Sequence, residues 1–171
     1  MFAGRLSPEK GVETLLEAWS LHQEPVRLLV AGDGDLAPAV QAAAAADPRI
    51  EFLGWQERER ISELVADAAC VVIPSLWYEG FVRTIVEAYA RGTPVLASHL
   101  GAMAELIDDG VTGHRFSPGD PQELADAFCE AWRSGGWKAM RPTARQRFLD
   151  RYTADANYRI LMSIYLSLIH I

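Results

Sequence analysis

The chain has 171 residues, half of them hydrophobic, and carries a net charge of −7 at pH 7. This length suits a single domain with a sizeable core. The acidic balance argues against a protein that binds the phosphate backbone of nucleic acid. The two cysteines, Cys70 and Cys129, have no metal-ligand neighbour at the usual short spacing. We expect both to be small buried side chains in a reducing compartment.

Two kinds of apolar pattern alternate along the chain. Short continuous apolar runs are typical of buried strands, and apolar residues three and four positions apart are typical of helices. The predicted strands lie at 2–6, 26–32, 49–54, 69–75, 94–98 and 113–118. The predicted helices lie at 11–22, 35–46 and 57–68, from Phe81 or Val82 onward, and at 102–107 and 121–132, with further helices beyond. This alternation predicts an α/β fold, a Rossmann-like parallel sheet with helices on both faces and a helical C-terminal extension.

The C-terminal segment is basic. Between Arg133 and Arg159, seven basic residues stand against two acidic ones. We favour a solvated helix face over a surface that docks on another domain or on an acidic membrane. No signal peptide or membrane-spanning segment is recognised, and the apolar LSLIHI at 166–171 is too short to cross a bilayer. We expect a cytoplasmic protein whose last residues form a truncated or non-native end.

A ligand is expected in the loops that follow the strands, because the carboxyl ends of parallel strands meet at one edge of the sheet. In AGDGDLA, Gly32, Gly34 and Ala37 match the G-x-G-x-x-A pattern of dinucleotide-binding proteins. The acidic residue that should follow, Glu51, lies near the start of a predicted strand instead of at its end. An NAD-dependent oxidoreductase is therefore the weaker interpretation. A tight turn explains the pattern, and at Gly34 such a turn also lets a nucleotide approach the backbone.

The same loop contains Asp33 and Asp35, a D-x-D pair that could hold a divalent metal on a diphosphate. Such pairs are common by chance, and Asp35 is well placed as the N-cap of the next helix. We favour the cap and predict no metal site.

Two glutamates flank the start of the helix that follows 69–75. Glu79 lies in the loop, and Glu87 lies eight positions later inside the helix. The helix start between them presents free N–H groups and a positive dipole end, which suit a phosphate. A carboxylate can accept from two hydroxyls, so the pair could hold a sugar on one side of a diphosphate and a ribose on the other. Arg5 and Lys10, after the first strand, could neutralise the diphosphate, although each charge alone is typical of a solvated surface.

Together these motifs resemble the retaining GT-B-fold glycosyltransferases known as family 4 or group 1. The matching segments occur in family order over nearly all of 1–132: GRLSPEKG, LLVAGDGDL, IEFLGW, VVIPSLWYEGF, GTPVLAS, GAMAELIDDGVTG and PGDPQELADAF. The resemblance implies one half of a GT-B fold, with a nucleotide-sugar-binding domain at 1–132. It also implies that the C-terminal helices at 133–171 pack toward an N-terminal domain missing from this chain.

The resemblance implies a role for individual residues. The implied catalytic residues are Arg5 and Lys10, which grip the diphosphate, and Glu79, which contacts the donor sugar. The implied substrate-binding residues contact the sugar, phosphate, ribose or base of the donor: Gly34, Trp55, Gly80, Phe81, Val82, Arg83, Thr84 and Glu87.

Within that set, Glu87 would take the ribose, Trp55 would border the base, and amides at 82–84 would hold phosphate. Family members usually carry a small residue or proline after the phenylalanine, where this chain has Val82 and Arg83. This departure leaves the identity of the donor sugar undetermined, because Arg83 could reach the sugar or the acceptor.

The implied reaction is transfer of a hexosyl group from a nucleotide-diphosphate sugar, with UDP the expected nucleotide, to a sugar, glycan or lipid acceptor. It would proceed with retention and without cofactor or metal. Because the acceptor-binding half is missing, we expect this chain alone to be inactive or nearly so, and any peripheral membrane contact to come through that half. The alternatives are a non-catalytic nucleotide-sugar-binding module, an NAD-linked oxidoreductase and a sugar epimerase on the same two-domain fold.

Overall fold

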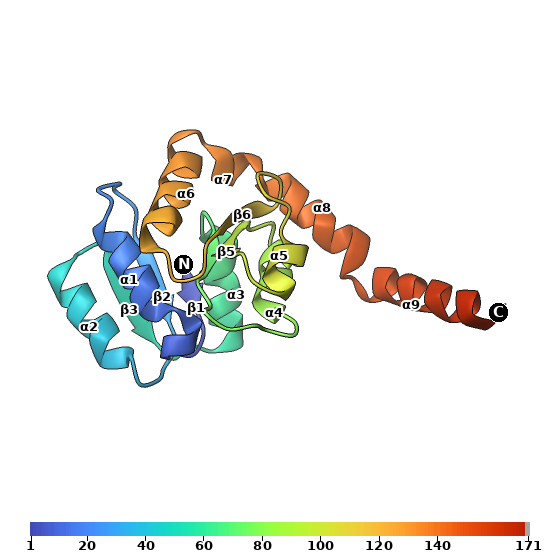
Figure 1. The fold of residues 1–171 in the computed structure, drawn as a ribbon, viewed down its shortest axis with the longest axis horizontal. Coiled ribbons are helices and arrows are strands. Elements are labelled where there is room, and N and C mark those ends of the chain that lie inside the picture. Colours follow the sequence, from blue (N-terminus) through green and yellow to red (C-terminus); the bar gives the residue numbers. More distant parts are fainter. Residues whose placement is uncertain (170–171) are drawn as a thin grey trace.

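A computed structural model describes residues 1–169 of the chain, and Figure 1 shows its elements. The strands are β1 (Phe2–Ala3), β2 (Leu28–Ala31), β3 (Ile50–Gly54), β4 (Val71–Ile73), β5 (Val95–Ser98) and β6 (Gly113–Phe116). The α-helices are α1 (Val12–Ser20), α2 (Ala37–Ala46), α3 (Arg58–Asp67), α4 (Arg83–Ala90), α5 (Ala102–Leu106), α6 (Pro121–Arg133), α7 (Gly136–Ala139), α8 (Arg141–Arg151) and α9 (Ala154–Ile169). A short 3₁₀ helix, η1 (Pro8–Lys10), precedes α1. The helix predicted from Phe81 or Val82 begins at Arg83, with Val82 as its N-cap.

All strand pairs are parallel, as predicted, and they form two three-stranded sheets in the orders β1-β2-β3 and β4-β5-β6. The two sheets meet at Met1, whose nitrogen donates to Cys70 O at 3.0 Å and whose carbonyl accepts from Val72 N at 2.8 Å. From this junction, β2 and β3 extend the sheet outward on the side of β1, and β5 and β6 extend it outward on the side of β4. The strand order therefore reverses between β1 and β4. In open α/β sheets, this reversal of strand order is where ligands bind. It brings the loops 4–11 and 74–82 to the same edge.

Side chains alternate across the strands into two cores, one on each face. In β2, Leu28 and Val30 pack with α1, α2, α6 and α7, whereas Ala31 packs with α3, α4 and α5. Burial on both faces explains why the strands read as continuous apolar runs. Cys70 and Cys129 are free and buried, as predicted, and burial raises the pKa of the Cys70 thiol to about 11.

The basic C-terminal segment is not simply a solvated helix face, so that prediction is wrong for α8. Arg141 donates to the carbonyl oxygens of Ala66 and Ala68 at 2.7 and 2.8 Å, and Arg145 donates to that of Ala90. These carbonyls belong to the C-terminal ends of α3 and α4. The end of a helix has unpaired carbonyl groups and a negative dipole end, so cations are favourable there. The arginines hold α8 against the sheet-covering helices.

Helix α9 projects away from the rest of the molecule (Figure 1). Its exposed large apolar side chains are Tyr158, Ile160, Leu161, Ile164, Tyr165, Leu166 and Leu168. Within residues 1–169, no helix combines the length and the apolar character needed to cross a membrane. The prediction about the segment 166–171 extends to positions 170 and 171, which lie outside the described residues.

Candidate functional site

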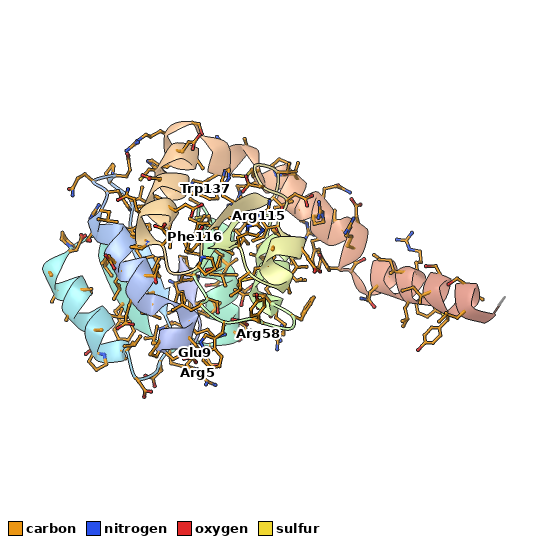
Figure 2. All side chains as sticks on the ribbon, viewed as in Figure 1. Arg5, Glu9, Arg58, Arg115, Phe116 and Trp137 are labelled. Carbon is orange, nitrogen blue, oxygen red and sulfur yellow. The ribbon has the colours of Figure 1, made fainter. Side chains whose placement is uncertain are left out.

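A cavity of about 410 Å³ opens at the carboxyl ends of β1, β2 and β3, beside the start of α4. It brings together predicted site residues from three separate segments: Arg5 after β1, Trp55 after β3, and Thr84 and Glu87 of α4. Each segment reaches this edge because it follows a parallel strand or begins the helix after one. Figure 2 shows Arg5 and Glu9 at the lower edge of the view, and Arg58 along the same edge.

Two glycines bring the loop after β2 against the loop after β1. A Cβ on Gly32 would lie 1.8 Å from the Gly4 carbonyl oxygen, and a Cβ on Gly34 would lie 2.5 Å from the Leu6 carbonyl oxygen. Gly32 lines the cavity and Gly34 does not. Close packing of the protein backbone thus accounts for the glycine at 34, and its contact with a nucleotide stays a prediction.

The prediction that Asp35 caps α2 is wrong. The N-cap is Leu36, which makes no side-chain capping bond, because the chain closes a turn in which Ala37 N bonds to Gly34 O before the helix begins. Asp33 lines the cavity and its Oδ1 accepts from Gly34 N at 2.8 Å. The described part of the chain contains no group of three or more histidine, cysteine or acidic side chains placed to hold a metal ion.

The loops after β1 and β4 cross at close range. Leu76 N donates to Glu9 O at 2.9 Å, and Ser75 Oγ lies 3.2 Å from the same oxygen. Gly11 has a φ of +69°, and a Cβ there would lie 1.8 Å from Pro74 O. Both the left-handed backbone and the close approach require glycine at this position. The crossing fixes the loop that carries Lys10 relative to the loop that carries Glu79.

Lys10 and Glu79 form an ion pair at this crossing. Lys10 Nζ lies 2.6 Å from Glu79 Oε1, and Ser75 Oγ donates to the same oxygen at 2.9 Å. Both side chains are partly shielded from solvent, at 33% and 23% exposure. Neither lines the cavity, so the pair occupies the loops that border it. Among the described residues Glu79 Oε2 has no hydrogen-bond partner and can accept from a ligand hydroxyl.

Glu87 lies on the cavity wall and is held by two arginines. Its Oε1 accepts from Arg83 at 3.0 Å and from Arg58 at 3.4 Å. The sequence left Arg83 free to reach a sugar or an acceptor, but in the structure it contacts Glu87. Arg58 is the first residue of α3, and its role was not predicted. It stands in the charged run ERER, where no pattern distinguishes it from its neighbours.

The remaining predicted residues surround the start of α4. Val82 is buried in the core, at 4% exposure, so only its backbone can face a ligand. Phe81 and Trp55 are exposed, and Trp55 lines the cavity together with Thr84 of the first turn of α4. Gly80 has open space around the position of a Cβ. The described structure therefore leaves Gly80 and Phe81 accessible to a ligand outside the 410 Å³ cavity.

Two other residues bear on the sequence argument. Glu51 is the second residue of β3 and pairs with Arg27 at 3.3 Å, so it lies toward the wrong end of its strand for a ribose-binding acidic residue. Ser75, which holds Glu79, was missed, although it stands in the quoted segment VVIPS directly after β4.

Comparisons with known proteins agree with this architecture. The family model described as "Glycosyl transferases group 1" matches residues 1–134. The chain is 30% identical to a glycosyltransferase of Methanocaldococcus jannaschii over 96% of this chain and 44% of that protein. It is 31% identical to phosphatidyl-myo-inositol mannosyltransferase of Mycobacterium leprae over 96% of this chain and 45% of that protein.

Solved structures show the same relation. The structure of Anabaena HepE in complex with UDP has a TM-score of 0.85 and 28% identity, covering 96% of this chain and 47% of that chain. Its complex with UDP-glucose has a TM-score of 0.83 over the same coverage.

The chain spans about half the length of the relatives that it matches. The predicted architecture, one half of a GT-B fold with a helical C-terminus, is confirmed by this similarity. The chain belongs to the group 1 glycosyltransferases.

Proposed function

We propose that this chain is the donor-binding half of a glycosyltransferase that transfers a hexosyl group, with retention, from a UDP-sugar. The observation that carries the proposal is the cavity at the strand ends, where Arg5, Trp55, Thr84 and Glu87 meet. A cation, an exposed aromatic ring, a helix start and a carboxylate match the diphosphate, base and ribose of a nucleotide. The similar Anabaena protein has been solved with UDP and with UDP-glucose, which supports UDP as the nucleotide.

The nucleotide would lie across the cavity. The uracil would rest against Trp55, whose side chain is 66% exposed, and the ribose hydroxyls would donate to Glu87. The phosphates would face the first turn of α4 at Thr84, because a helix start offers unpaired N–H groups and a positive dipole end. Arg5 on the cavity wall would add a cation to the same diphosphate.

The donor sugar would lie over the loop that carries Glu79, Gly80 and Phe81. Glu79 Oε2 would accept from a sugar hydroxyl, and Lys10 would turn toward the diphosphate that leaves. Two cations, Lys10 and Arg5, could then balance the charge that develops on the diphosphate as the glycosidic bond breaks. This arrangement would supply the role that a divalent metal plays in other transferases, so we propose that donor binding is independent of metal.

Calorimetry on the 171-residue chain tests the proposal. The expected result is binding of UDP in the presence of EDTA, and no binding of NAD. If UDP binds only after magnesium or manganese is added, the metal-free account is wrong and Asp33 and Asp35 become the candidate ligands. If NAD binds and UDP does not, the chain is a dinucleotide-binding domain.

Catalysis would require the rest of the protein. Transfer needs the acceptor hydroxyl held against the anomeric carbon, and much of the rate comes from that positioning. We expect the full-length protein to release a product of the same anomeric configuration as the donor, detectable by NMR, and the present chain to show little or no transfer. A full-length protein that binds UDP-sugar without turnover would favour the non-catalytic module, and an altered free nucleotide sugar would favour the epimerase.

A further inference from the structure

We propose that Arg83, assisted by Arg58, is a positioning residue that holds the Glu87 carboxylate where it can accept from the ribose hydroxyls. The inference rests on the proposed nucleotide site. It assigns Arg83 to the ribose end of that site, and not to the sugar or the acceptor.

The contacts divide the Glu87 carboxylate into two unlike oxygens. Oε1 accepts from Arg83 Nη2 at 3.0 Å and from Arg58 Nη2 at 3.4 Å. Oε2 has no hydrogen-bond partner within residues 1–169. The guanidinium groups therefore fix the carboxylate by one oxygen and leave the other open for a ligand. Because the carboxylate is already held in one orientation, it loses little side-chain entropy when it accepts a charge-assisted hydrogen bond.

Helix stability does not explain Arg83. It is the first residue of α4, where a positive charge opposes the positive end of the helix dipole. The pair also runs in the less favourable direction along the helix, with the cation on the N-terminal side. Arg83 and Arg58 are 70% and 78% exposed, and exposed ion pairs of this kind add little to folding. Since the contacts of Arg83 and Arg58 with Glu87 add little to stability, we assign them the role of orienting the Glu87 carboxylate.

A second cavity explains why Glu87 needs to be held. This cavity, also about 410 Å³, lies between α3, α4 and α8, and it shares Ile61, Thr84 and Glu87 with the nucleotide cavity. Its lining also includes three arginines, Arg58, Arg91 and Arg145. A Glu87 side chain released from Arg83 could turn toward Arg91, four positions on, and away from the ribose. Of the three residues that the two cavities share, Glu87 alone carries a charge, and the direction of its carboxylate decides whether the ribose is recognised.

The test compares UDP with 2′,3′-dideoxy-UDP, which lacks both ribose hydroxyls, by calorimetry. In the unchanged chain UDP should bind about tenfold more tightly or better, the worth of one charge-assisted hydrogen bond. In Arg83→Ala this preference should fall to about threefold or less, through weaker UDP binding with the dideoxy analogue nearly unaffected. Arg83→Lys should restore part of the preference, because a lysine can still reach Glu87 four positions on. Arg58→Ala should reduce the preference by a smaller factor, in keeping with its longer contact.

Arg60→Ala is the matched control, because it removes the same charge from an exposed arginine that pairs with Glu63 on α3. It should leave the preference unchanged, and circular dichroism should show that every variant is folded. Equal weakening of UDP and the dideoxy analogue by Arg83→Ala would make Arg83 a phosphate ligand and overturn the inference. An unchanged preference would also overturn it. A chain that binds no UDP at all would overturn the proposed function itself, and the inference with it.

Discussion

The ammonium group of Lys10 lies 2.6 Å from the carboxylate of Glu79, although the two residues are 69 positions apart in the chain. The contact exists because the loops after β1 and β4 cross, with Gly11 packed against Pro74. Without a donor, each charge neutralises the other. A UDP-sugar would offer its diphosphate to Lys10 and a hydroxyl to Glu79, so donor binding would exchange one ion pair for two ligand contacts.

Glu79→Gln should therefore separate the two halves of the donor. The substitution removes the charge that holds Lys10, so UDP should bind as tightly as before or more tightly. UDP-glucose should bind more weakly, by the worth of a charged hydrogen bond, about 1.5–3 kcal/mol. Calorimetry with the two ligands measures both changes. Equal losses for UDP and UDP-glucose would remove Glu79 from the sugar end of the site.

Glu87→Gln should behave differently. Because Glu87 would contact the ribose that both ligands share, the binding free energies of UDP and UDP-glucose should weaken by the same amount, again about 1.5–3 kcal/mol. Glu63→Gln on the exposed face of α3 is the control and should change neither affinity. An effect confined to UDP-glucose would exchange the roles assigned to Glu79 and Glu87.

Gly11 should be far more sensitive to substitution than Gly110. Both have left-handed backbones, with φ of +69° and +71°, so alanine costs about 1–2 kcal/mol at either position through strain. At Gly11 the new Cβ would also lie 1.8 Å from Pro74 O, whereas nothing lies within 4 Å at Gly110. Urea unfolding should show a loss of about 3 kcal/mol or more for Gly11→Ala and only the strain cost for Gly110→Ala. Equal losses would mean that the loop crossing yields without cost.

His22 should make stability depend on pH. It is buried beside the rings of Trp19 and Phe128, and burial, with Arg49 nearby, holds the pKa of its imidazole below the usual value. The unfolded chain then binds a proton more readily than the folded one, so stability is highest above the unfolded pKa, about 6.5, and falls as pH drops below it.

Urea unfolding at pH 7 and pH 5 measures this effect. The fall in unfolding free energy amounts to about 1.4 kcal/mol for each pH unit between the unfolded and folded pKa values. His22→Gln should make the fall smaller, and the same substitution at the exposed His99 should not. If His22→Gln retains the full pH dependence, other groups must account for it, such as the carboxylates or the Met1 amine, whose pKa is also lowered by burial.

The order of helices and strands could be predicted from the sequence because burial on both faces leaves continuous apolar strands between amphipathic helices. The parallel arrangement then placed Arg5, Trp55, Thr84 and Glu87 at one edge, and the structure joins them in one cavity. Sheet geometry determines where the loops meet, but Trp55 and Thr84 were singled out within them only by the family resemblance.

The partners of the charged side chains could not be predicted, because they depend on how elements far apart in the sequence pack against one another. Arg58 on α3 contacts Glu87 on α4. Arg141 and Arg145, on α8, contact the C-terminal ends of α3 and α4. A count of charges gives a basic segment and cannot show that its arginines bind carbonyl groups. Asp35 failed as a cap because the turn closed by Ala37 N and Gly34 O precedes the helix, and Leu36 N bonds to Leu6 O, a long-range partner that the local sequence does not reveal.

The structure of this chain with UDP bound and no added metal would test the central claim most directly. The account predicts uracil against Trp55, ribose hydroxyls within hydrogen-bond distance of Glu87, and phosphates between the first turn of α4 and Arg5, with Lys10 turned away from Glu79. UDP bound elsewhere, or bound at this edge through a metal held by Asp33 and Asp35 with Glu87 unused, would contradict it.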